Sequence, residues 1–524
     1  MQTSTALPRP HLLVSSIVLW AIGFVAMLVY SRQLLHTDFF FDEAWRSDII
    51  RSSHPFATMR TIDTPIPPLW PWILHASSAI VGGRFFGLRL QGAALAALCP
   101  AAIGQLVRVV GAARPTGQVP TRGPQWAHGL TRAVLATVFA AACLDGSSVA
   151  TYFNDYAFQG ALALAMVLVL FGIDQGWWRA WWAVPAVLAV AVGTLSGLFL
   201  LPAVAVWALR PTRRQHARIV LPALAASGVV AIALYLSLYR GRVDDALTSF
   251  WADDILRHGT RSVVGTFVHL VRTAGGFLYP TTDQAWTIPL GLLLLGLGAY
   301  GFSQLRQRWP WLGRMGVSAW VIAAAASVVA SWPVTTVRVN MPFLVLWIAA
   351  AFIGLAHLFD RAVAAAPGHV TPARVTVALA AVVALFSLSS LPDQYPRTGL
   401  FAKGLDGDLQ IIRASSAPHI LVFGYHWMSF PYIHDGLINR RDDGSRYHTV
   451  QDSLEDPLVE RDVVALAEQQ HLQPGDEVWC VIPIGVDGDV VDRACPFDRD
   501  GFTPITTQQG RRSIIIGYRV TAAG

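Results

Sequence analysis

Long apolar segments recur along the chain as far as residue 391, and short polar loops separate them. A helix needs roughly 20 mostly apolar residues to cross a bilayer, and many of these segments approach that length. The pattern therefore predicts a polytopic α-helical membrane protein. The candidate spans are residues 12–30, 66–82, 88–107, 132–145, 157–173, 180–194, 196–209, 218–238, 287–302, 316–331, 339–358 and 374–391.

The character of the chain changes after residue 391, where Asp, Glu, Gly and Pro occur throughout. Short β-like runs there alternate with a helix-like stretch at residues 458–470. We therefore expect a transmembrane module at residues 1–391 and a small extracytoplasmic α/β domain at residues 392–524. The β-like runs are residues 420–423, 477–482 and 513–520.

The composition agrees with a membrane protein, since 54% of the residues are hydrophobic and 14% are charged. A soluble domain typically carries about 25% charged residues. The excess positive charge is mostly arginine in short loops, which is typical of cytoplasmic loops and does not indicate a nucleic-acid partner. The loop arginines are Arg108, Arg114, Arg122, Arg132, Arg210, Arg213, Arg214, Arg218, Arg306, Arg308, Arg314, Arg361 and Arg374.

The basic loops also decide which apolar segments cross the membrane. If residues 66–82 crossed, the basic loop at residues 108–132 would lie outside, against the positive-inside rule. We therefore expect residues 66–82 to form a proline-led helix on the outer surface. About eleven transmembrane helices then remain, in a plasma membrane, with the N-terminus cytoplasmic and the C-terminal domain outside. The outer side receives a first loop at residues 31–87, a long loop at residues 239–286 and a short loop around residues 145–155.

The four cysteines divide by location into two groups of two. Cys99 and Cys143 lie in apolar spans, where we expect them to be packing residues. Cys480 and Cys495 lie in the polar C-terminal region, at a spacing that permits a disulfide if that region is extracytoplasmic.

The carboxylates of Asp42 and Glu43 follow the first span directly. Ionisable groups near membrane depth are costly and usually mark a pathway or a reaction site. Asp42 shares one face of a predicted amphipathic helix with Arg46, while Trp45 lies on the apolar face, which suits the membrane interface. An alternative is a purely local role, in which helix-dipole attraction and an Asp42–Arg46 pair explain the charges.

Three further polar elements lie at the outer ends of predicted spans. The run at residues 64–72 contains Pro67 and Pro68 and leads into a short helix, which indicates a rigid helix start. Residues 152–156 place Asp155 on the same side of the membrane as Asp42, although an ordinary loop end with interfacial aromatic residues explains this run equally well.

The third element is the entry to the span at residues 339–358. Arg338 lies on the outer side, whereas arginine elsewhere concentrates on the inner side. A guanidinium at this place can hold a lipid phosphate through two hydrogen bonds, and Asn340 can add another. The alternative is an arginine that only anchors the helix end at the interface.

The long outer loop contains a further amphipathic stretch at residues 249–259. Asp253, Asp254 and His258 could bind a metal there, because residues four apart share a helical face. A solvated surface helix is the more common explanation of such a pattern.

Taken in order, these elements resemble the GT-C superfamily of integral-membrane glycosyltransferases, in the branch of the protein O-mannosyltransferases and aminoarabinose transferases. The matching elements are Asp42-Glu43, then Pro67-Pro68-Leu69, then the phrase at residues 86–90. An aromatic turn at residues 152–158 and an arginine before a proline-containing late helix, Arg338 to Pro342, complete the series. Two positions depart from the family pattern, since Ile66 stands where a histidine is common and Asp155-Tyr156 where an Arg-Tyr pair is common.

The resemblance implies a GT-C fold and a transferase that moves a hexose or pentose from a polyprenyl-phosphate donor to a glycan, lipid or protein acceptor outside the cell. Asp42 would be the general base of an inverting displacement, and Arg338 would hold the leaving phosphate. No cofactor is required with certainty, and a divalent metal is left open. The implied roles are catalysis for Asp42, Glu43 and Asp155, donor phosphate binding for Arg338, Asn340 and Arg89, and substrate binding for Trp45, Pro67, Pro68, Tyr152, Tyr156 and His258.

Two other classes of function remain open at this point. A proton-coupled transporter or flippase could use Asp42 and Asp155 as relays, although the acids gather at outer helix ends and the sequence has no evident internal repeat. A non-catalytic binding or scaffold protein could act through its outer domain alone.

Overall fold

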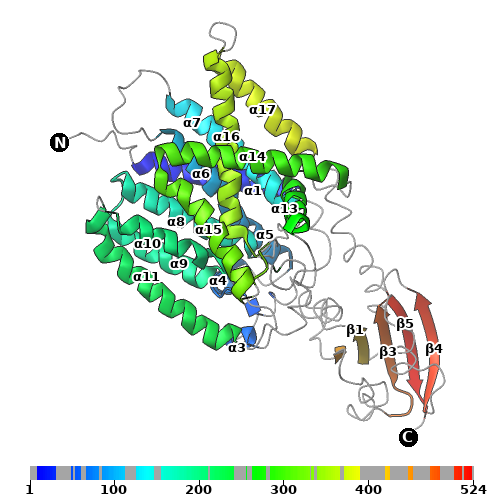
Figure 1. Ribbon diagram of the computed structural model, residues 1–524. Helices are drawn as coiled ribbons and strands as arrows, with labels where there is room; N and C mark the ends of the chain where they lie inside the picture. The colour runs from blue at the N-terminus through cyan, green and yellow to red at the C-terminus, as the bar shows by residue number, and fades with distance from the viewer. Residues whose placement is uncertain are drawn as a thin grey trace. The chain divides into compact units, whose positions relative to one another are not determined.

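The computed structural model describes two compact units of the chain, and each is considered by itself (Figure 1). The first unit comprises Met1–Arg32, Ser52–Ser77 and Arg89–Tyr395, and the second comprises Gln33–Arg51, Ser78–Leu88 and Pro396–Gly524. The described residues are 9–30, 46, 49–50, 54–60, 66–81, 85–112, 125–146, 155–210, 213–240, 255, 263–278, 284–330, 332–334, 339–365, 371–389, 419–424, 447–451, 473–483, 501–509 and 513–521.

The first unit is a helical bundle, as the apolar pattern predicts; only residues 78–81 of α4 and 85–88 of α5, of the helices given below, belong to the second unit. Only a helix satisfies its own backbone hydrogen bonds within a lipid-facing segment, so each apolar run of the chain becomes one. Its elements are α1 (Arg9–Tyr30), α3 (Pro55–Met59), α4 (Leu69–Val81), α5 (Phe85–Ala96), α6 (Leu98–Ala112), α7 (Gln125–Gly146), α8 (Tyr156–Asp174), η2 (Ala180–Trp182), α9 (Ala183–Gly193), η3 (Ser196–Leu200), α10 (Leu201–Ala208), α11 (Arg214–Leu234), the π-helical η5 (Tyr235–Tyr239), α13 (Val263–Leu278), α14 (Gln284–Arg308), α15 (Pro310–Ala330), α16 (Met341–Ala365) and α17 (Pro372–Ser389).

Seven helices of the described residues are long and apolar enough to cross a membrane. Four shorter apolar helices accompany them, at Gly129–Leu144, Ala180–Gly193, Ser196–Ala208 and Ala373–Leu388. The prediction of a multi-pass membrane protein is therefore confirmed, while the count of eleven crossings stays a prediction.

Helix α4 is short and has one buried and one exposed face, while its predicted place on the outer surface stays a prediction. Its 13 residues span about 20 Å at 1.5 Å per residue, which is short of the roughly 30 Å of a bilayer core. Trp70 and Leu74 are fully buried on one face, whereas Trp72 on the other is 40% exposed. The sequence did not predict α13, which lies in the long loop at residues 239–286 and packs against α14 and α7.

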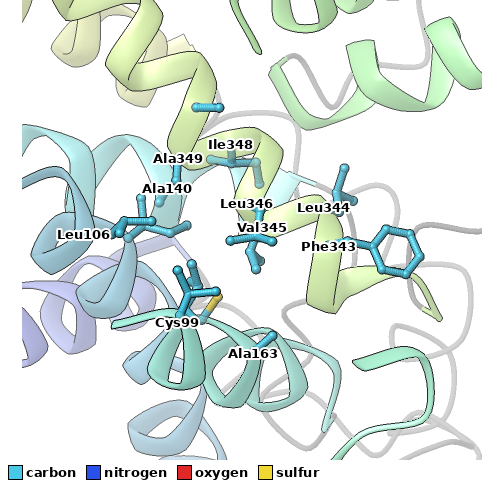
Figure 2. Close-up of a cluster of buried hydrophobic side chains, with 14 of the residues drawn as sticks. Cys99, Leu106, Ala140, Ala163, Phe343, Leu344, Val345, Leu346, Ile348 and Ala349 are labelled. Atoms are coloured by element: carbon cyan, nitrogen blue, oxygen red, sulfur yellow. The ribbon is translucent and has the colours of Figure 1, made fainter. Parts of the chain in front are cut away.

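The core of the bundle surrounds α16. Figure 2 shows Phe343, Val345 and Ile348 of α16 in the buried cluster that also contains Cys99 of α6 and Ala163 of α8. Small residues let the helices approach this closely, as is common in membrane bundles.

The crossing of α14 over α16 is the tightest of these approaches (Figure 1). A Cβ added at Gly301 of α14 would clash with the carbonyl oxygen of Ala350, and one at Gly354 of α16 would clash with the carbonyl oxygen of Leu297. Glycine is therefore required at both positions by steric contact between the two backbones.

The second unit contains a five-stranded mixed sheet in the order β2-β1-β3-β5-β4. Strand β1 pairs in parallel with β2 and β3, whereas β5 pairs antiparallel with β3 and β4. Pro504 lies at a register shift in the edge strand β4, where the missing N–H costs no internal ladder bond. The strands are β1 (His419–Gly424), β2 (Tyr447–Gln451), β3 (Glu477–Pro483), β4 (Phe502–Gln509) and β5 (Ser513–Val520).

Strand β3 holds Cys480, which is fully buried and disulfide-bonded. Cys99 and Cys143 are free and buried in the bundle, and the predicted partner Cys495 lies outside the described residues. The predicted β-like runs correspond to β1, β3 and β5, while the helix-like stretch at residues 458–470 lies outside the described residues. The domain boundary at residue 392 stays a prediction.

Candidate functional site

The two ends of the helical bundle differ in charge, and the difference locates the candidate site. At one end, the guanidinium of Arg132 on α7 pairs with Asp360 on α16, with a distance of 3.0 Å between Nη1 and Oδ2. Arg308 and Arg361, from the ends of α14 and α16, lie within electrostatic range of His357 at the same end. The N-terminal part of α7 and the C-terminal parts of α14 and α16 therefore meet there.

The remaining basic loop joins the same end through a second group of charges. Arg213, before α11, pairs with Asp174 at the end of α8. Arg210, after α10, lies within electrostatic range of both Asp174 and Arg314 at the start of α15. All the basic loops whose residues the structure describes thus gather at one end of the bundle, which we call the basic end.

The opposite end, which we call the polar end, carries Asp155. This residue directly precedes α8, which then runs towards Asp174 at the basic end. Asp155 is only 1% exposed. A negative charge at a helix N-terminus is favoured by the aligned peptide dipoles, which explains how the carboxylate is tolerated there.

Gln159 holds the Asp155 carboxylate. Its Nε2 donates to Asp155 Oδ2 at 2.7 Å, and its Oε1 accepts from the backbone N–H of Leu195 at 3.0 Å. Gln159 is fully buried, one helical turn after Asp155. The glutamine therefore connects the carboxylate to the turn between α9 and η3, and it fixes the position of one oxygen.

The turn between α9 and η3 explains the pair of short apolar segments at residues 180–194 and 196–209. Its tip reaches the polar end through Leu195, and α10 returns to Arg210 at the basic end. Figure 1 shows α8, α9, α10 and α11 side by side. The two short segments therefore run between the same two ends as the long helices.

The proline element also lies at the polar end. Pro67 and Pro68 are buried, and a Cβ added at Gly193 of α9 would lie 3.0 Å from Leu69 Cδ2. The hydroxyl of Tyr239, in the π-helical turn after α11, donates to the carbonyl of Ile66 at 3.1 Å. Tyr239 also lies within electrostatic range of Asp155, so the proline element, the π-helical turn and the carboxylate are neighbours.

Asn340 anchors the entry to α16. Its Nδ2 donates to the carbonyls of Pro333 and Val334 at 2.8 and 3.0 Å, and its Oδ1 accepts from Trp332 Nε1 at 2.9 Å. The side chain is 1% exposed. Asn340 therefore holds the residues on either side of the segment that contains Arg338.

Two more of the predicted site residues lie among the described residues. Tyr156 is the first residue of α8 and is largely buried. Arg89 on α5 is 1% exposed and ranks among the largest fully buried side chains. Ionisable groups buried in membrane helices usually mark functional sites, which makes Arg89 a functional candidate on physical grounds.

Several predicted residues lie outside the described residues, and their roles remain predictions. They are Asp42, Glu43, Trp45, Tyr152, His258 and Arg338. Within the described ranges there is no group of three or more His, Cys, Asp or Glu side chains that could hold a metal ion. The candidate metal ligands Asp253, Asp254 and His258 are not among those ranges.

Sequence reasoning did not find Gln159 or Tyr239. Gln159 was counted as part of an apolar span, although a lone amide one turn after Asp155 was a usable signal. Tyr239 carried no local signal, because its link to Ile66 joins segments far apart in the sequence.

No protein-family model matches the chain, and no curated protein sequence matches it. The fold, however, is similar to solved structures over nearly the whole length. It matches ArnT from Cupriavidus metallidurans in the apo state with a TM-score of 0.53 and 15% identity, covering 97% of this chain and 98% of ArnT. It matches the same ArnT bound to undecaprenyl phosphate with a TM-score of 0.54 and 14% identity, covering 98% of each chain. The chain therefore shares its overall membrane-protein fold with these ArnT structures.

Proposed function

We propose that this protein is a membrane glycosyltransferase that moves a sugar from a polyprenyl-phosphate donor to an acceptor on the outer face of the membrane. The observation that carries the proposal is the fold similarity, over 98% of both chains, to an ArnT structure bound to undecaprenyl phosphate. The acceptor class is a glycan, lipid or protein of the cell envelope, and the sugar is a hexose or a pentose.

Two observations support the orientation that this function needs. The basic end gathers arginines of the short loops, and such loops remain cytoplasmic. The polar end would then face outwards, together with the N-termini of α8 and α16. The disulfide at Cys480 supports an extracytoplasmic location for the sheet, because disulfides persist in oxidising compartments. The plasma membrane, with the N-terminus inside, is the membrane that fits both.

Among the described residues of the polar end, the carboxylate of Asp155 is held in place by a buried partner. Asp155 has one oxygen bound by Gln159, and the buried Pro67 and Pro68 lie near its helix. A charge that is fixed and buried interacts strongly with a nearby substrate, because little solvent screens it. We assign Asp155 as the second carboxylate of the active site, beside Asp42. Pro67, Pro68 and Tyr156 would form the wall that contacts the substrate.

We assign Asn340 a positioning role. Both of its amide hydrogens already donate to backbone carbonyls, so it serves a phosphate best by shaping the segment of Arg338. Arg338 would then hold the departing phosphate through two charge-assisted hydrogen bonds, with Arg89 as a second cation at the phosphate.

The reaction follows from these roles as a single displacement. Asp42 accepts the proton of the acceptor hydroxyl while its oxygen forms a bond to the anomeric carbon of the donor. The bond between that carbon and the phosphate oxygen breaks, and its electron pair leaves with the polyprenyl phosphate, stabilised by Arg338. The configuration at the anomeric carbon is inverted. Glu43 supports Asp42 or contacts a metal, and Trp45, Tyr152 and His258 are further substrate contacts.

The donor assignment can be tested by binding of undecaprenyl phosphate to the purified full-length protein. We expect saturable binding that the Arg338→Gln variant weakens by about tenfold or more, since hydrogen bonds to charged groups are worth about 1.5–3 kcal/mol. Arg374→Gln, at the predicted cytoplasmic end, is the matched control and should leave binding unchanged. Equal binding by wild type and Arg338→Gln would remove Arg338 from the site.

A transport function gives a different outcome in reconstituted vesicles. A flippase would move a labelled polyprenyl-phosphate sugar between leaflets without consuming it, whereas the proposed enzyme converts it in the presence of acceptor. Movement of intact lipid at a rate that depends on Asp155 would favour the transporter.

A further inference from the structure

A cavity of about 540 Å³ lies at the basic end of the bundle, between α14, α15 and α16. Its walls are mostly apolar and include Phe302 and Trp347. Its polar groups are Ser303, Arg306 and Gln307, which lie on the last two turns of α14 and are exposed. These polar groups belong to the basic end, whereas the candidate active site lies at the polar end.

The geometry around Arg306 is held by close packing of α14 against α15. A Cβ added at Gly313 would lie 2.8 Å from the backbone nitrogen of Arg306, and one at Gly316 would clash with the ring of Phe302. The two glycines let α14 and α15 pack closely together beside the cavity. The backbone of Arg306 is therefore fixed, while its guanidinium remains at the exposed rim.

Exposed apolar residues lead from the cavity along both helices. On α14, Leu293 is 52% exposed, and on α15, Val317 and Val321 are 51% and 63% exposed. Val317 also lines the cavity, and Val321 lies one turn further along the same face. In a bilayer, this surface would contact acyl chains, so the cavity opens beside lipid at the level of the headgroups.

The charge around the cavity favours an anion. Among the described residues Arg306 makes no salt bridge, and Arg308 and Arg314 follow it in sequence at the same end. The carboxylates described at this end, Asp174 and Asp360, are each already paired with an arginine. The field at the rim is therefore positive, and basic pockets between membrane helices on the cytoplasmic side suit anionic headgroups.

We propose that this cavity binds one anionic phospholipid of the inner leaflet. The phosphate oxygens accept hydrogen bonds from the Arg306 guanidinium and from the side chains of Ser303 and Gln307, and an acyl chain lies along Val317 and Val321. This site goes beyond the proposed transferase and does not depend on it, because no sugar donor or acceptor is involved.

The test is a lipid titration of the delipidated full-length protein in detergent, followed by native mass spectrometry. Phosphatidylglycerol should bind with one site of distinctly higher affinity, and phosphatidylcholine should lack that site. Arg306→Gln should weaken the first phosphatidylglycerol by about tenfold, the usual size of one lost charge-assisted hydrogen bond. Ala299→Trp, which fills the cavity from an exposed wall position, should weaken it without removing any charge.

Arg218→Gln is the matched control, since Arg218 is an exposed arginine near the start of α11 and does not line the cavity. An equal loss of affinity in Arg218→Gln would overturn the proposal in favour of diffuse attraction. Equal binding of phosphatidylcholine, or full binding by Ala299→Trp, would overturn it as well. Displacement of the lipid by millimolar inorganic phosphate would show a free-anion site instead of a lipid site.

Discussion

Replacing Gln159 by leucine tests whether the Asp155 carboxylate depends on its buried partner. Leucine keeps the apolar bulk of the side chain but removes both hydrogen bonds, the 2.7 Å bond to Asp155 and the 3.0 Å bond from the Leu195 N–H. The buried carboxylate and the partly buried N–H then lose this partner. Asp155 in particular is a charge that is only 1% exposed.

The magnitude follows from these two bonds. A hydrogen bond to a charged group contributes about 1.5–3 kcal/mol and an ordinary one about 1 kcal/mol. Hydrogen bonds within membrane bundles average less, at about 0.6 kcal/mol. We therefore expect Gln159→Leu to lower the free energy of unfolding by about 2 kcal/mol, most of it from the charged bond. The rate of sugar transfer should fall by more than the loss of folded protein explains, because one oxygen of Asp155 loses its fixed position.

The assay pairs thermal unfolding in detergent with single-turnover transfer, and it compares Gln159→Leu with Gln105→Leu. Gln105 is also a buried glutamine of a membrane helix, but it accepts only a 3.3 Å bond from the neutral Ser15 hydroxyl. We expect Gln105→Leu to cost less than about 1 kcal/mol and to retain activity. If the two variants lose equal stability and equal activity, the proposal that Gln159 positions the Asp155 carboxylate for transfer is refuted.

The remaining predictions concern packing and the disulfide. Gly301→Val should prevent normal accumulation of the protein in the membrane, because the new side chain clashes with the Ala350 carbonyl. Gly296→Val on the same helix places its side chain in open space, so this control should accumulate normally. Immunoblotting of membranes measures both amounts. Cys480→Ser should lower stability by about 3 kcal/mol, the usual effect of opening a loop of roughly 15 residues. Unfolding of this variant should be insensitive to reductant, whereas Cys143→Ser, a free buried thiol, should keep the sensitivity of the wild type; a variant at Cys480 that still responds to reductant would contradict the assignment.

The sequence predicted the membrane class well, because the signals for it are local. The length of an apolar run and the arginines at its ends belong to the segment itself, so the sequence alone assigns the basic segments that follow residues 305 and 360 to one end. The contacts of Arg132 with Asp360 and of Arg213 with Asp174 agree with that assignment. The sequence did not predict helix α13, because His269 and Arg272 interrupt its apolar run.

The candidate site could be predicted only in part. Asp155 and Asn340 were found because they are polar groups at the ends of apolar spans, but what they contact could not be deduced. The bond from Tyr239 to Ile66 depends on how distant segments meet, and no spacing in the sequence encodes that. The acidic pair Asp42-Glu43 lies outside the described residues, so its role rests on position and resemblance alone.

The most direct measurement is sugar transfer by the purified protein in nanodiscs, using a panel of labelled polyprenyl-phosphate sugars and cell-envelope acceptors. The proposed function predicts release of polyprenyl phosphate and an inverted glycosidic product with at least one donor. Asp42→Asn should abolish both while the thermal unfolding profile is retained. Full activity in Asp42→Asn would contradict the base assignment, and intact donors throughout the panel with wild-type protein would contradict the transferase itself.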